Sequence, residues 1–381
     1  MNSKIKIILV AGARPNFMKI APLIHEMEKY EMFDTLLVHT GQHYDEKMSE
    51  LFFEQLNIPE PDVNLEVGSA SHAVQTARIM ERFEKVCIDE KPDAVLVVGD
   101  VNSTVACVLV ATKLNIKTIH YEAGLRSNDR TMPEEINRVV TDAICDIFFT
   151  TSSDADNNLI REGKDPYKIF MTGNLMIDSL INNLNKSKKI KVEIKGNNGE
   201  KYKYGENIKS GEYGIMTFHR PSNVDRKDDL EELIEIWGSI SERLPLIFPV
   251  HPRTLKNIKN FRLTERIKSF SNLIICKPLG YLEFLKLVSG AKFVLTDSGG
   301  IQEETTYLNI PCLTLRRNTE RPITITEGSN KLVKKNEIIQ EINLILNGKG
   351  KRGKIPKYWD GKSADRIVEI LKSIFIDKWR N

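Results

Sequence analysis

The residues best suited to chemistry follow short apolar runs, at the points where buried strands would end. Asp100 closes "DAVLVVGD" (93–100), and Glu122 lies in "KTIHYEAG" (117–124). In open α/β sheets, ligands bind outside the carboxyl ends of the strands. We therefore expect one ligand-binding cleft to be lined by Arg14, Gln42, His43, Asp100, Glu122, Arg126, His219, Arg220, His251 and the segment Asp297-Ser298-Gly299-Gly300.

Proton transfer is the chemistry that Asp100, Glu122, Glu134 and His219 would support. Carboxylates and imidazoles act as general acids and bases when burial and nearby charges tune their pKa values. Structural alternatives stay open. Asp100 can cap the helix that follows it, and the acids after Pro133 can complement a helix dipole.

The segment "VLTDSGGIQEETTYL" (294–308) predicts a strand, a glycine turn and a helix. Free N–H groups at a helix start favour an anion, although Ser298 can also act as an ordinary N-cap. An acid further into the helix can bind ribose hydroxyls. Adjacent residues point about 100° apart on a helix, so we expect only one of Glu303 and Glu304 to face the ligand. The pattern suggests a sugar nucleotide.

The segment "GARPNFMK" (12–19) follows the first apolar run. Gly12 permits a tight turn, Arg14 can bind a phosphate with two parallel hydrogen bonds, and Lys19 would lie near the same point. Both cations can also be solvated charges. The segment is not G-x-G-x-x-G, which argues against a nicotinamide or flavin site.

Other catalytic and metal-binding patterns are absent from the sequence. The seven histidines are dispersed, without H-E-x-x-H or clustered Cys/His spacing, so no metal is expected. There is no G-x-S-x-G or Walker motif. The cysteines lack C-x-x-C spacing and are expected to be buried thiols; they are Cys87, Cys107, Cys145, Cys276 and Cys312.

Length and charge predict two domains of an ordinary soluble protein. The chain has 381 residues and a formal net charge of +3, so neither nucleic-acid nor membrane partners are expected. It has no apolar run of about 18 residues and no N-terminal segment typical of a signal peptide. We therefore expect a cytoplasmic protein.

Apolar runs alternate with helical patterns, which predicts βαβ units and parallel sheets. A first helix is expected from about Phe17 to Tyr30. The alternation breaks over 185–212, which we interpret as a linker with irregular structure, and it ends in an amphipathic helix over 362–380. The strands are expected at 5–12, 35–40, 93–100, 117–124, 146–152, 212–220, 244–252, 272–280, 291–300 and 310–315.

Nine segments together resemble the non-hydrolysing UDP-N-acetylglucosamine 2-epimerases, from Ile5 to about Ile370. They are "GARPNFMKIAPL", "TGQHYD", "GDVNST", "EAGLRS", "MPEEINR", "HRPSNVD", "PVHPR", "LTDSGGIQEE" and "NTERP". The resemblance implies a GT-B fold, in which two Rossmann-like, doubly wound domains hold the active site in the cleft between them. We expect these domains at 1–184 and 185–361, with a helix at 362–381 crossing back to the first.

The resemblance also implies an activity. UDP-GlcNAc and UDP-ManNAc would interconvert by elimination of UDP to 2-acetamidoglucal and re-addition with a proton on the opposite face of C2. It implies no cofactor and no obligatory metal, a homodimer, and a product that feeds cell-surface polysaccharide synthesis.

Site residues follow from the same motifs. Matches to diphosphate contacts are Arg14, His219, Ser298, Gly299, Gly300 and Arg321, with Lys19 nearby. Glu304 resembles the ribose-binding glutamate and Phe284 a residue packing on uracil. Asp100, Glu122 and Glu134 match acids of proton transfer or sugar orientation. Residues resembling those around a second, allosteric substrate site are Gln42, His43, Glu135, Arg220 and His251.

The chain departs from many bacterial members at Asn16, where a Glu is common, and at Asp45. We expect Asn16 to alter the helix start rather than to abolish activity.

The sequence leaves four alternatives to the leading function: an epimerase for a 2,3-diacetamido uronic acid nucleotide, a GT-B glycosyltransferase, a hydrolysing epimerase, and a binder without enzymatic activity.

Overall fold

The computed structural model describes residues 4–41, 57–197 and 199–380. The chain forms two compact units. Unit 1 comprises Met1–Ile181 and Lys357–Asn381, and unit 2 comprises Asn182–Pro356. The C-terminal helix α16 (Ser363–Arg380) therefore belongs to unit 1, where it packs on α1 (Arg14–Met27) and β1 (Ile5–Ala11).

Within the described residues, unit 1 contains a seven-stranded parallel sheet with the order β3-β2-β1-β4-β5-β6-β7. This order extends the 3-2-1-4-5-6 order of doubly wound nucleotide-binding sheets. The strands are β1 (Ile5–Ala11), β2 (Phe33–His39), β3 (Val63–Asn64), β4 (Ala94–Val98), β5 (Lys117–Tyr121), β6 (Ile147–Thr150) and β7 (Ile169–Met171).

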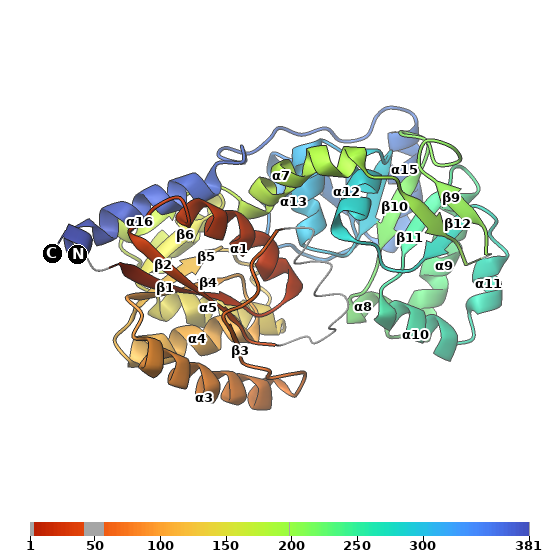
Figure 1. The fold of residues 1–381 in the computed structure, drawn as a ribbon. Helices are drawn as coiled ribbons and strands as arrows, with labels where there is room; N and C mark the ends of the chain where they lie inside the picture. Colours follow the sequence, from red (N-terminus) through yellow and green to blue (C-terminus); the bar gives the residue numbers. More distant parts are fainter. Residues whose placement is uncertain (1–3, 42–56, 198, 381) are drawn as a thin grey trace. The chain divides into compact units, whose positions relative to one another are not determined.

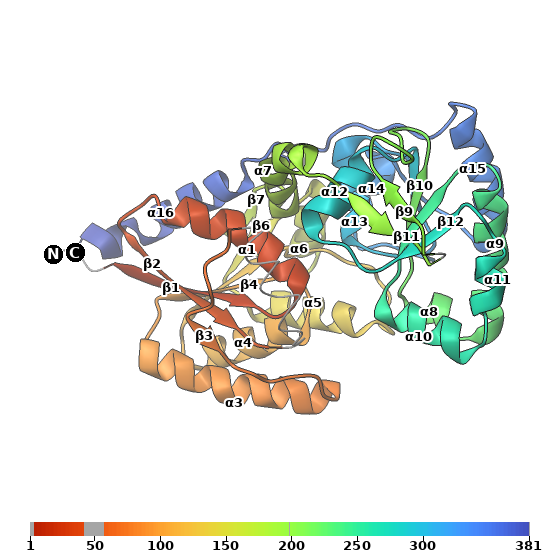
Figure 2. The same cartoon turned by 45° about the vertical axis from the view of Figure 1, so that its right-hand side comes forward.

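Helices cover both faces of this sheet (Figures 1 and 2). Helices α3, α4 and α5 pack side by side on one face, whereas α1 and α16 pack together on the other. The helices of unit 1 are α1 (Arg14–Met27), α3 (His72–Glu90), α4 (Asn102–Lys113), α5 (Pro133–Ile144), α6 (Ser153–Arg161), the 3-10 turn η1 (Pro166–Lys168) and α7 (Leu175–Lys189), which runs on into unit 2.

Unit 2 repeats the same order in the part of the chain that the structure describes. Its six parallel strands are arranged β12-β11-β10-β13-β14-β15. They are β10 (Gly214–Thr217), β11 (Leu246–Pro249), β12 (Leu273–Cys276), β13 (Phe293–Thr296), β14 (Cys312–Thr314) and β15 (Asn330–Leu332). The helices are α8 (Pro221–Val224), α9 (Lys227–Ser241), α10 (Pro252–Asn260), α11 (Thr264–Lys268), α12 (Tyr281–Ser289), α13 (Gly300–Leu308), α14 (Ile323–Thr326), the 3-10 turn η2 (Lys335–Glu337) and α15 (Ile338–Leu346).

The strands form where the sequence is continuously apolar and β-branched, because a parallel sheet is buried on both faces. All five residues of β4, "AVLVV", are buried. In unit 2, one face of the sheet packs around Trp237, whose ring centroid lies 5.3 Å from that of Phe218 and 5.2 Å from that of Phe248. The ten strands expected from the sequence are confirmed; nine are shorter than expected, whereas β2 begins two residues earlier, at Phe33.

Two expectations need correction. Helix α1 begins at Arg14 rather than near Phe17, because Pro15 is favourable in the first helical turn. The segment 185–212 is not wholly irregular: α7 continues to Lys189, and β8 (Glu193–Lys195) pairs with β9 (Lys201–Lys203). The alternation was too short to recognise, yet Val192 and Ile194 are buried in the core of unit 2.

The cysteine expectation is confirmed, since all five thiols are free and buried. In the described ranges, the acids, histidines and cysteines form no cluster that could hold a metal ion. Nor does any described helix combine the length and apolarity needed to cross a membrane.

Candidate functional site

In unit 1, the switch point of the strand order lies between β1 and β4, and Asn16 connects the segments that follow these strands. Its side-chain oxygen accepts hydrogen bonds from the N–H groups of Gly12 (3.1 Å) and Ala13 (2.8 Å). Its side-chain amide donates to the carbonyl of Val98 at 3.2 Å. Asn16 thus orders the turn at the start of α1, as its departure from the family pattern suggested.

Glu122 follows β5 in an unusual backbone conformation. Its φ is +71°, a left-handed conformation that costs an L-residue roughly 1–2 kcal/mol. The carboxylate pairs with the ammonium of Lys19 from α1, with 2.5 Å between Oε2 and Nζ. Only 3% of the Glu122 side chain and 6% of the Lys19 side chain are exposed. A buried carboxylate needs such a counter-charge.

Gly99 marks the point where these side chains converge. Its φ is +70°, and a Cβ added there would lie 3.2 Å from Asn16 Nδ2 and 3.4 Å from both Glu122 Oε2 and Lys19 Nζ. The end of β4, the end of β5 and the first turns of α1 therefore meet around one glycine. The next residue in the chain is Asp100.

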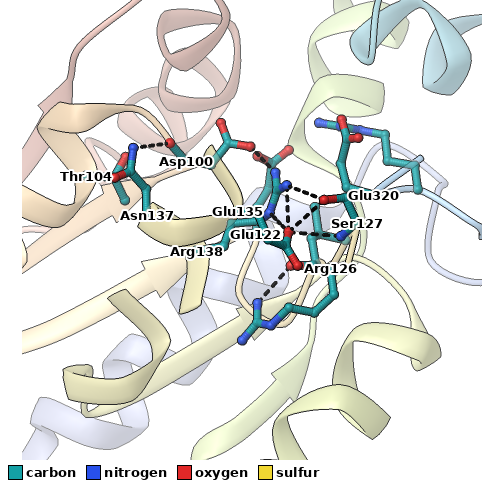
Figure 3. A network of polar contacts seen from close by, with 12 residues as sticks. Asp100, Thr104, Glu122, Arg126, Ser127, Glu135, Asn137, Arg138 and Glu320 are labelled. Carbon is teal, nitrogen blue, oxygen red and sulfur yellow. Dashed lines mark hydrogen bonds and ion pairs between the residues drawn. The ribbon is translucent and has the colours of Figure 1, made fainter. Parts of the chain in front are cut away.

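Asp100 is held by Arg138 of α5, an arginine that sequence reasoning missed (Figure 3). The carboxylate accepts a hydrogen bond from Arg138 Nη1, and Asn137 Nδ2 donates to the Asp100 carbonyl at 2.9 Å. Asp100 does not cap α4, because the N-cap is Val101. The capping alternative for Asp100 is therefore wrong. The i, i+3 spacing of Glu135 and Arg138 on a helix was a signal for part of this network.

Glu135, expected near an allosteric site, is surrounded by donors of its own unit (Figure 3). It is 2% exposed and accepts hydrogen bonds from Ser127 N (2.9 Å), Asn128 N (2.9 Å) and Arg138 Nε (2.9 Å). Burial opposes ionisation, but the hydrogen bond from Ser127 and the Arg138 guanidinium outweigh it and lower the pKa of Glu135. These contacts favour a structural role.

Further site residues expected in unit 1 are Glu134, Arg14, Gln42 and His43. Glu134 is exposed in the first turn of α5, where both acids follow Pro133 as the helix-start alternative expected. Arg14 is the first residue of α1. Gln42 and His43, expected near the allosteric site, and Asp45 lie outside the described residues.

In unit 2, the switch point lies between β10 and β13, and Asp297 connects the segments that follow them. The carboxylate lies 2.9 Å from His219 Nδ1 and accepts hydrogen bonds from Arg220 N (2.9 Å) and Asn223 Nδ2 (3.1 Å). Burial opposes its ionisation, but the contact with His219 outweighs it and lowers the pKa of Asp297. His219 Nδ1–H therefore donates to Asp297, which leaves Nε2 for a ligand.

His251 lies beside this pair, with its ring centroid 5.4 Å from that of His219. Burial, followed by the charge of His219, lowers its pKa. Nδ1 of His251 accepts a hydrogen bond from Arg253 N at the start of α10. This contact gives His251 a structural role as the N-cap of α10. That role does not require a ligand.

Helix α13 begins at Gly300, after the N-cap Gly299. Ser298 is not the cap, so the simple capping alternative is wrong. A Cβ added to Gly299 would lie 2.9 Å from Glu320 Oε1 and 3.0 Å from Arg321 Nη1. The glycine lets these two side chains approach the backbone at the mouth of the helix, where N–H groups favour an anion.

Glu303 binds Arg321 rather than only complementing the helix dipole. Oε1 of Glu303 lies 2.9 Å from Arg321 Nε, and the Glu303 side chain is 2% exposed. Arg321 also pairs with Glu320, which lies 2.7 Å from Arg316 Nη2. Glu303 therefore orients Arg321, the predicted diphosphate contact.

Glu304, the predicted ribose-binding residue, is buried beside a tyrosine of α12. Burial raises the pKa of Glu304 to about 7, although a hydrogen bond with Tyr281 opposes the shift. Phe284 lies one turn further along α12 than Tyr281, so both belong to one face of this helix. Phe284 is half-buried against the core, and α12 packs on α13.

Comparisons with known proteins agree on one family. The model of the UDP-N-acetylglucosamine 2-epimerase family matches residues 25–372. The UDP-N-acetylglucosamine 2-epimerase of Methanocaldococcus jannaschii is 44% identical over 370 residues, covering 96% of this chain and 98% of the relative. The UDP-2,3-diacetamido-2,3-dideoxy-D-glucuronate 2-epimerase of Pseudomonas aeruginosa is 35% identical, covering 97% and 100%.

A solved structure gives the same result. The crystal structure of M. jannaschii UDP-GlcNAc 2-epimerase in complex with UDP-GlcNAc and UDP matches with a TM-score of 0.86 at 43% identity, covering 97% of this chain and 100% of that chain. The two Rossmann-like, doubly wound units are those of the GT-B class, which confirms the expected fold class. The chain belongs to the UDP-N-acetylglucosamine 2-epimerase family.

Proposed function

We propose that this protein catalyses the reversible C2 epimerisation of UDP-GlcNAc to UDP-ManNAc. The observation that carries the proposal is the buried Lys19–Glu122 pair, in which Glu122 has a left-handed backbone conformation at the end of β5. The proposal is supported by a relative named UDP-N-acetylglucosamine 2-epimerase that matches this chain over nearly its full length. A strained conformation at a strand end is typical of functional sites.

The reaction balances without a redox partner. In the first step a base removes the C2 proton, the bond between C1 and the diphosphate oxygen breaks with its electron pair passing to UDP, and a C1–C2 double bond forms. In the second step UDP adds back to C1 while an acid delivers a proton to the opposite face of C2. Because no electrons are gained or lost overall, we propose that no cofactor is needed.

Proton transfer is the role we propose for the acids of unit 1. Lys19 offsets the charge of the buried Glu122 carboxylate, and Arg138 orients Asp100. Both carboxylates are therefore fixed at neighbouring strand ends, as general acid–base catalysis requires. We propose the same role, or orientation of the sugar, for Glu134.

Nucleotide binding is the role we propose for unit 2. The N–H groups at the start of α13 and the nearby Arg321 would stabilise the departing diphosphate, since preorganised dipoles and charges act best on charge that develops during the reaction. His219 would contribute from Nε2. Ser298, Gly299 and Gly300 complete the proposed diphosphate contacts of unit 2, with Phe284 on the uracil.

A related substrate is the second candidate, because the P. aeruginosa relative named for a 2,3-diacetamido glucuronate nucleotide is 35% identical. The experiment is a direct comparison of kcat/KM for C2 inversion of UDP-GlcNAc and of that uronate. We expect the higher value for UDP-GlcNAc. Inactivity on UDP-GlcNAc with turnover of the uronate would overturn the leading assignment.

Binding of UDP-GlcNAc should depend on pH through Glu304. Its pKa is raised to about 7, so the carboxylate is ionised only above that pH. Ribose hydroxyls donate best to the ionised form, so the Kd should rise as pH falls below about 7, by up to about tenfold per pH unit. Isothermal titration of UDP-GlcNAc suits this test, because its doubly esterified diphosphate does not titrate near neutrality.

Glu304→Gln is the matched control for this prediction. Protonation of histidines would strengthen diphosphate binding and so act in the opposite direction, in both proteins alike. The difference between wild type and variant therefore isolates Glu304. Parallel pH profiles for the two proteins would contradict the assigned role.

Assembly and cellular role follow from the family resemblance. We propose a homodimer, for which exposed Val74, Ile136 and Val140 on α3 and α5 offer apolar surface. Light scattering should then give twice the chain mass of 43.5 kDa, and a monomeric mass would contradict it. We also propose a cytoplasmic enzyme whose product supplies cell-surface polysaccharide synthesis.

A further inference from the structure

We propose that His120 and Asp142 form a buried ion pair whose role is to position Asp100 and Glu122 for proton transfer. Neither residue is singled out by any motif, and 22 residues separate them in the sequence. The inference rests on the proposed epimerase function and extends it to two positioning residues that touch no substrate.

The hydrogen bonds of His120 fix its charge. Its side chain and that of Asp142 are both fully buried. Nδ1 lies 2.6 Å from Asp142 Oδ1, and Nε2 lies 2.9 Å from the carbonyl oxygen of Gly99. A carboxylate and a carbonyl can only accept hydrogen bonds, so both ring nitrogens must carry protons. His120 is an imidazolium, and Asp142 is its counter-ion.

The pair contacts the backbone on either side of the catalytic acids. His120 donates to the carbonyl of Gly99, which immediately precedes Asp100. Asp142 Oδ2 accepts a hydrogen bond of 2.9 Å from the N–H of Gly124, two residues after Glu122. One buried pair therefore ties the segment that carries Asp100 to the segment that carries Glu122.

The outer side of Asp142 is fixed as well. Arg126 Nη2 lies 2.7 Å from Asp142 Oδ2 and 2.6 Å from Glu162 Oε2. The two cations and two anions of this group, His120, Arg126, Asp142 and Glu162, balance in charge. Asp142 consequently has little freedom to move. The N–H of Gly124, which donates a hydrogen bond to Asp142, is therefore held in place as well.

The backbone of these two segments requires such restraint. Gly99, Glu122 and Gly124 have φ values of +70°, +71° and +78°. A Cβ added to Gly124 would lie 2.3 Å from the carbonyl oxygen of Ala155. Glycine adopts positive φ values readily, but the left-handed conformation of Glu122 is sparsely populated and persists only where the surroundings determine it. A buried ion pair is by itself weak evidence for stability, so positioning explains this pair better than stability does.

A double-mutant cycle tests the inference. The variants are His120→Gln, Asp142→Asn and the double variant, measured for kcat, for KM with UDP-GlcNAc, for UDP binding and for Tm. We expect each single variant to lose about 10- to 100-fold in kcat with KM and UDP affinity changed less than about threefold. Residues that act as one unit are not additive, so the double variant should lose no more than the singles.

Stability distinguishes positioning from a structural role. Each single variant unbalances the charge of the buried group formed by His120, Arg126, Asp142 and Glu162 and should lower the Tm. The double variant is neutral and should regain much of the Tm while its kcat stays low. If kcat recovers with Tm in the double variant, or if no variant loses turnover, the positioning role is refuted.

Asp178→Asn is the matched control. Asp178 is a buried carboxylate of the same unit, 1% exposed, and accepts a hydrogen bond of 2.8 Å from Ala364 N at the start of α16. It lies outside the proposed machinery, so this variant should change Tm without lowering kcat.

A spectroscopic measurement tests the charge state of the His120–Asp142 pair independently of epimerase activity. Nitrogen NMR of histidine-labelled wild-type protein should show both His120 ring nitrogens protonated, with Asp142→Asn abolishing that signature. A neutral wild-type His120 would overturn the pair. Absence of epimerisation by the wild type would refute the proposed function instead, and the two failures are thus distinguishable.

Discussion

Replacing Glu122 by Gln is expected to lower kcat by about 10²-fold or more, the typical cost of removing a proton-transfer group, while the Kd for UDP stays unchanged. The substitution retains the size of the side chain but removes its ability to take a proton. Lys19 then faces an amide instead of the carboxylate 2.5 Å away. UDP affinity should persist, because the proposed nucleotide contacts lie mainly in unit 2. Asp100→Asn should behave in the same way.

The control for this substitution is Glu90→Gln. Glu90 also pairs with a lysine, at 2.9 Å from Lys6 Nζ, but this pair is partly exposed and lies near the start of β1. Its loss should leave kcat unchanged. Near-wild-type turnover of both Glu122→Gln and Asp100→Asn would refute their catalytic roles, whereas loss of UDP binding would identify them as structural residues.

Replacing Asp297 by Asn should have the second large effect, on both turnover and stability. The carboxylate is fully buried and faces donors from His219, Arg220 and Asn223. An amide nitrogen would face some of these donors without an acceptor, at a cost of about 1–3 kcal/mol in the free energy of unfolding. His219 would also lose the partner that fixes its tautomer, so kcat should fall by about 10²-fold.

Denaturant unfolding and steady-state kinetics together check this prediction. Asp225→Asn is the control, because Asp225 forms a more exposed ion pair with Arg253 in the same unit. That variant should alter both quantities little. Wild-type kcat per folded molecule in Asp297→Asn would show that Asp297 supports the fold without orienting His219.

Much of the fold could be predicted because its signals are local. Continuous apolar runs such as "AVLVV" identify buried parallel strands, and the order of runs and helical patterns predicts two doubly wound units. The hairpin of β8 and β9 was missed because three-residue strands are too short to show alternation. Its strands form because Val192 and Ile194 reach the core of unit 2.

The site could be predicted only as far as the strand ends. The sequence identifies which residues follow strands, so Asp100, Glu122, His219 and 297–300 were expected together. It cannot identify partners that are brought together by tertiary packing. Arg321 lies 18 residues after Glu303, and His120 lies 22 residues before Asp142.

The two adjacent glutamates of α13 illustrate this limit. Helix geometry predicts that Glu303 and Glu304 point in different directions, and the structure gives them different partners, Arg321 and Tyr281. Nothing in the local sequence names those partners. Glycines and acids can therefore share one turn without conflict, because Glu303 binds and orients Arg321 while the helix N–H groups remain for an anion.

The proposed reaction requires that C2 exchanges its proton with solvent while the sugar stays a UDP-sugar. The most direct test is incubation of UDP-GlcNAc with the protein in D2O, followed by proton NMR. We predict the appearance of UDP-ManNAc, with deuterium at C2 in the epimer and, at equilibrium, in the recovered substrate. Epimerisation with retention of the C2 proton, release of free ManNAc, or transfer of the sugar to an acceptor without exchange would contradict the account.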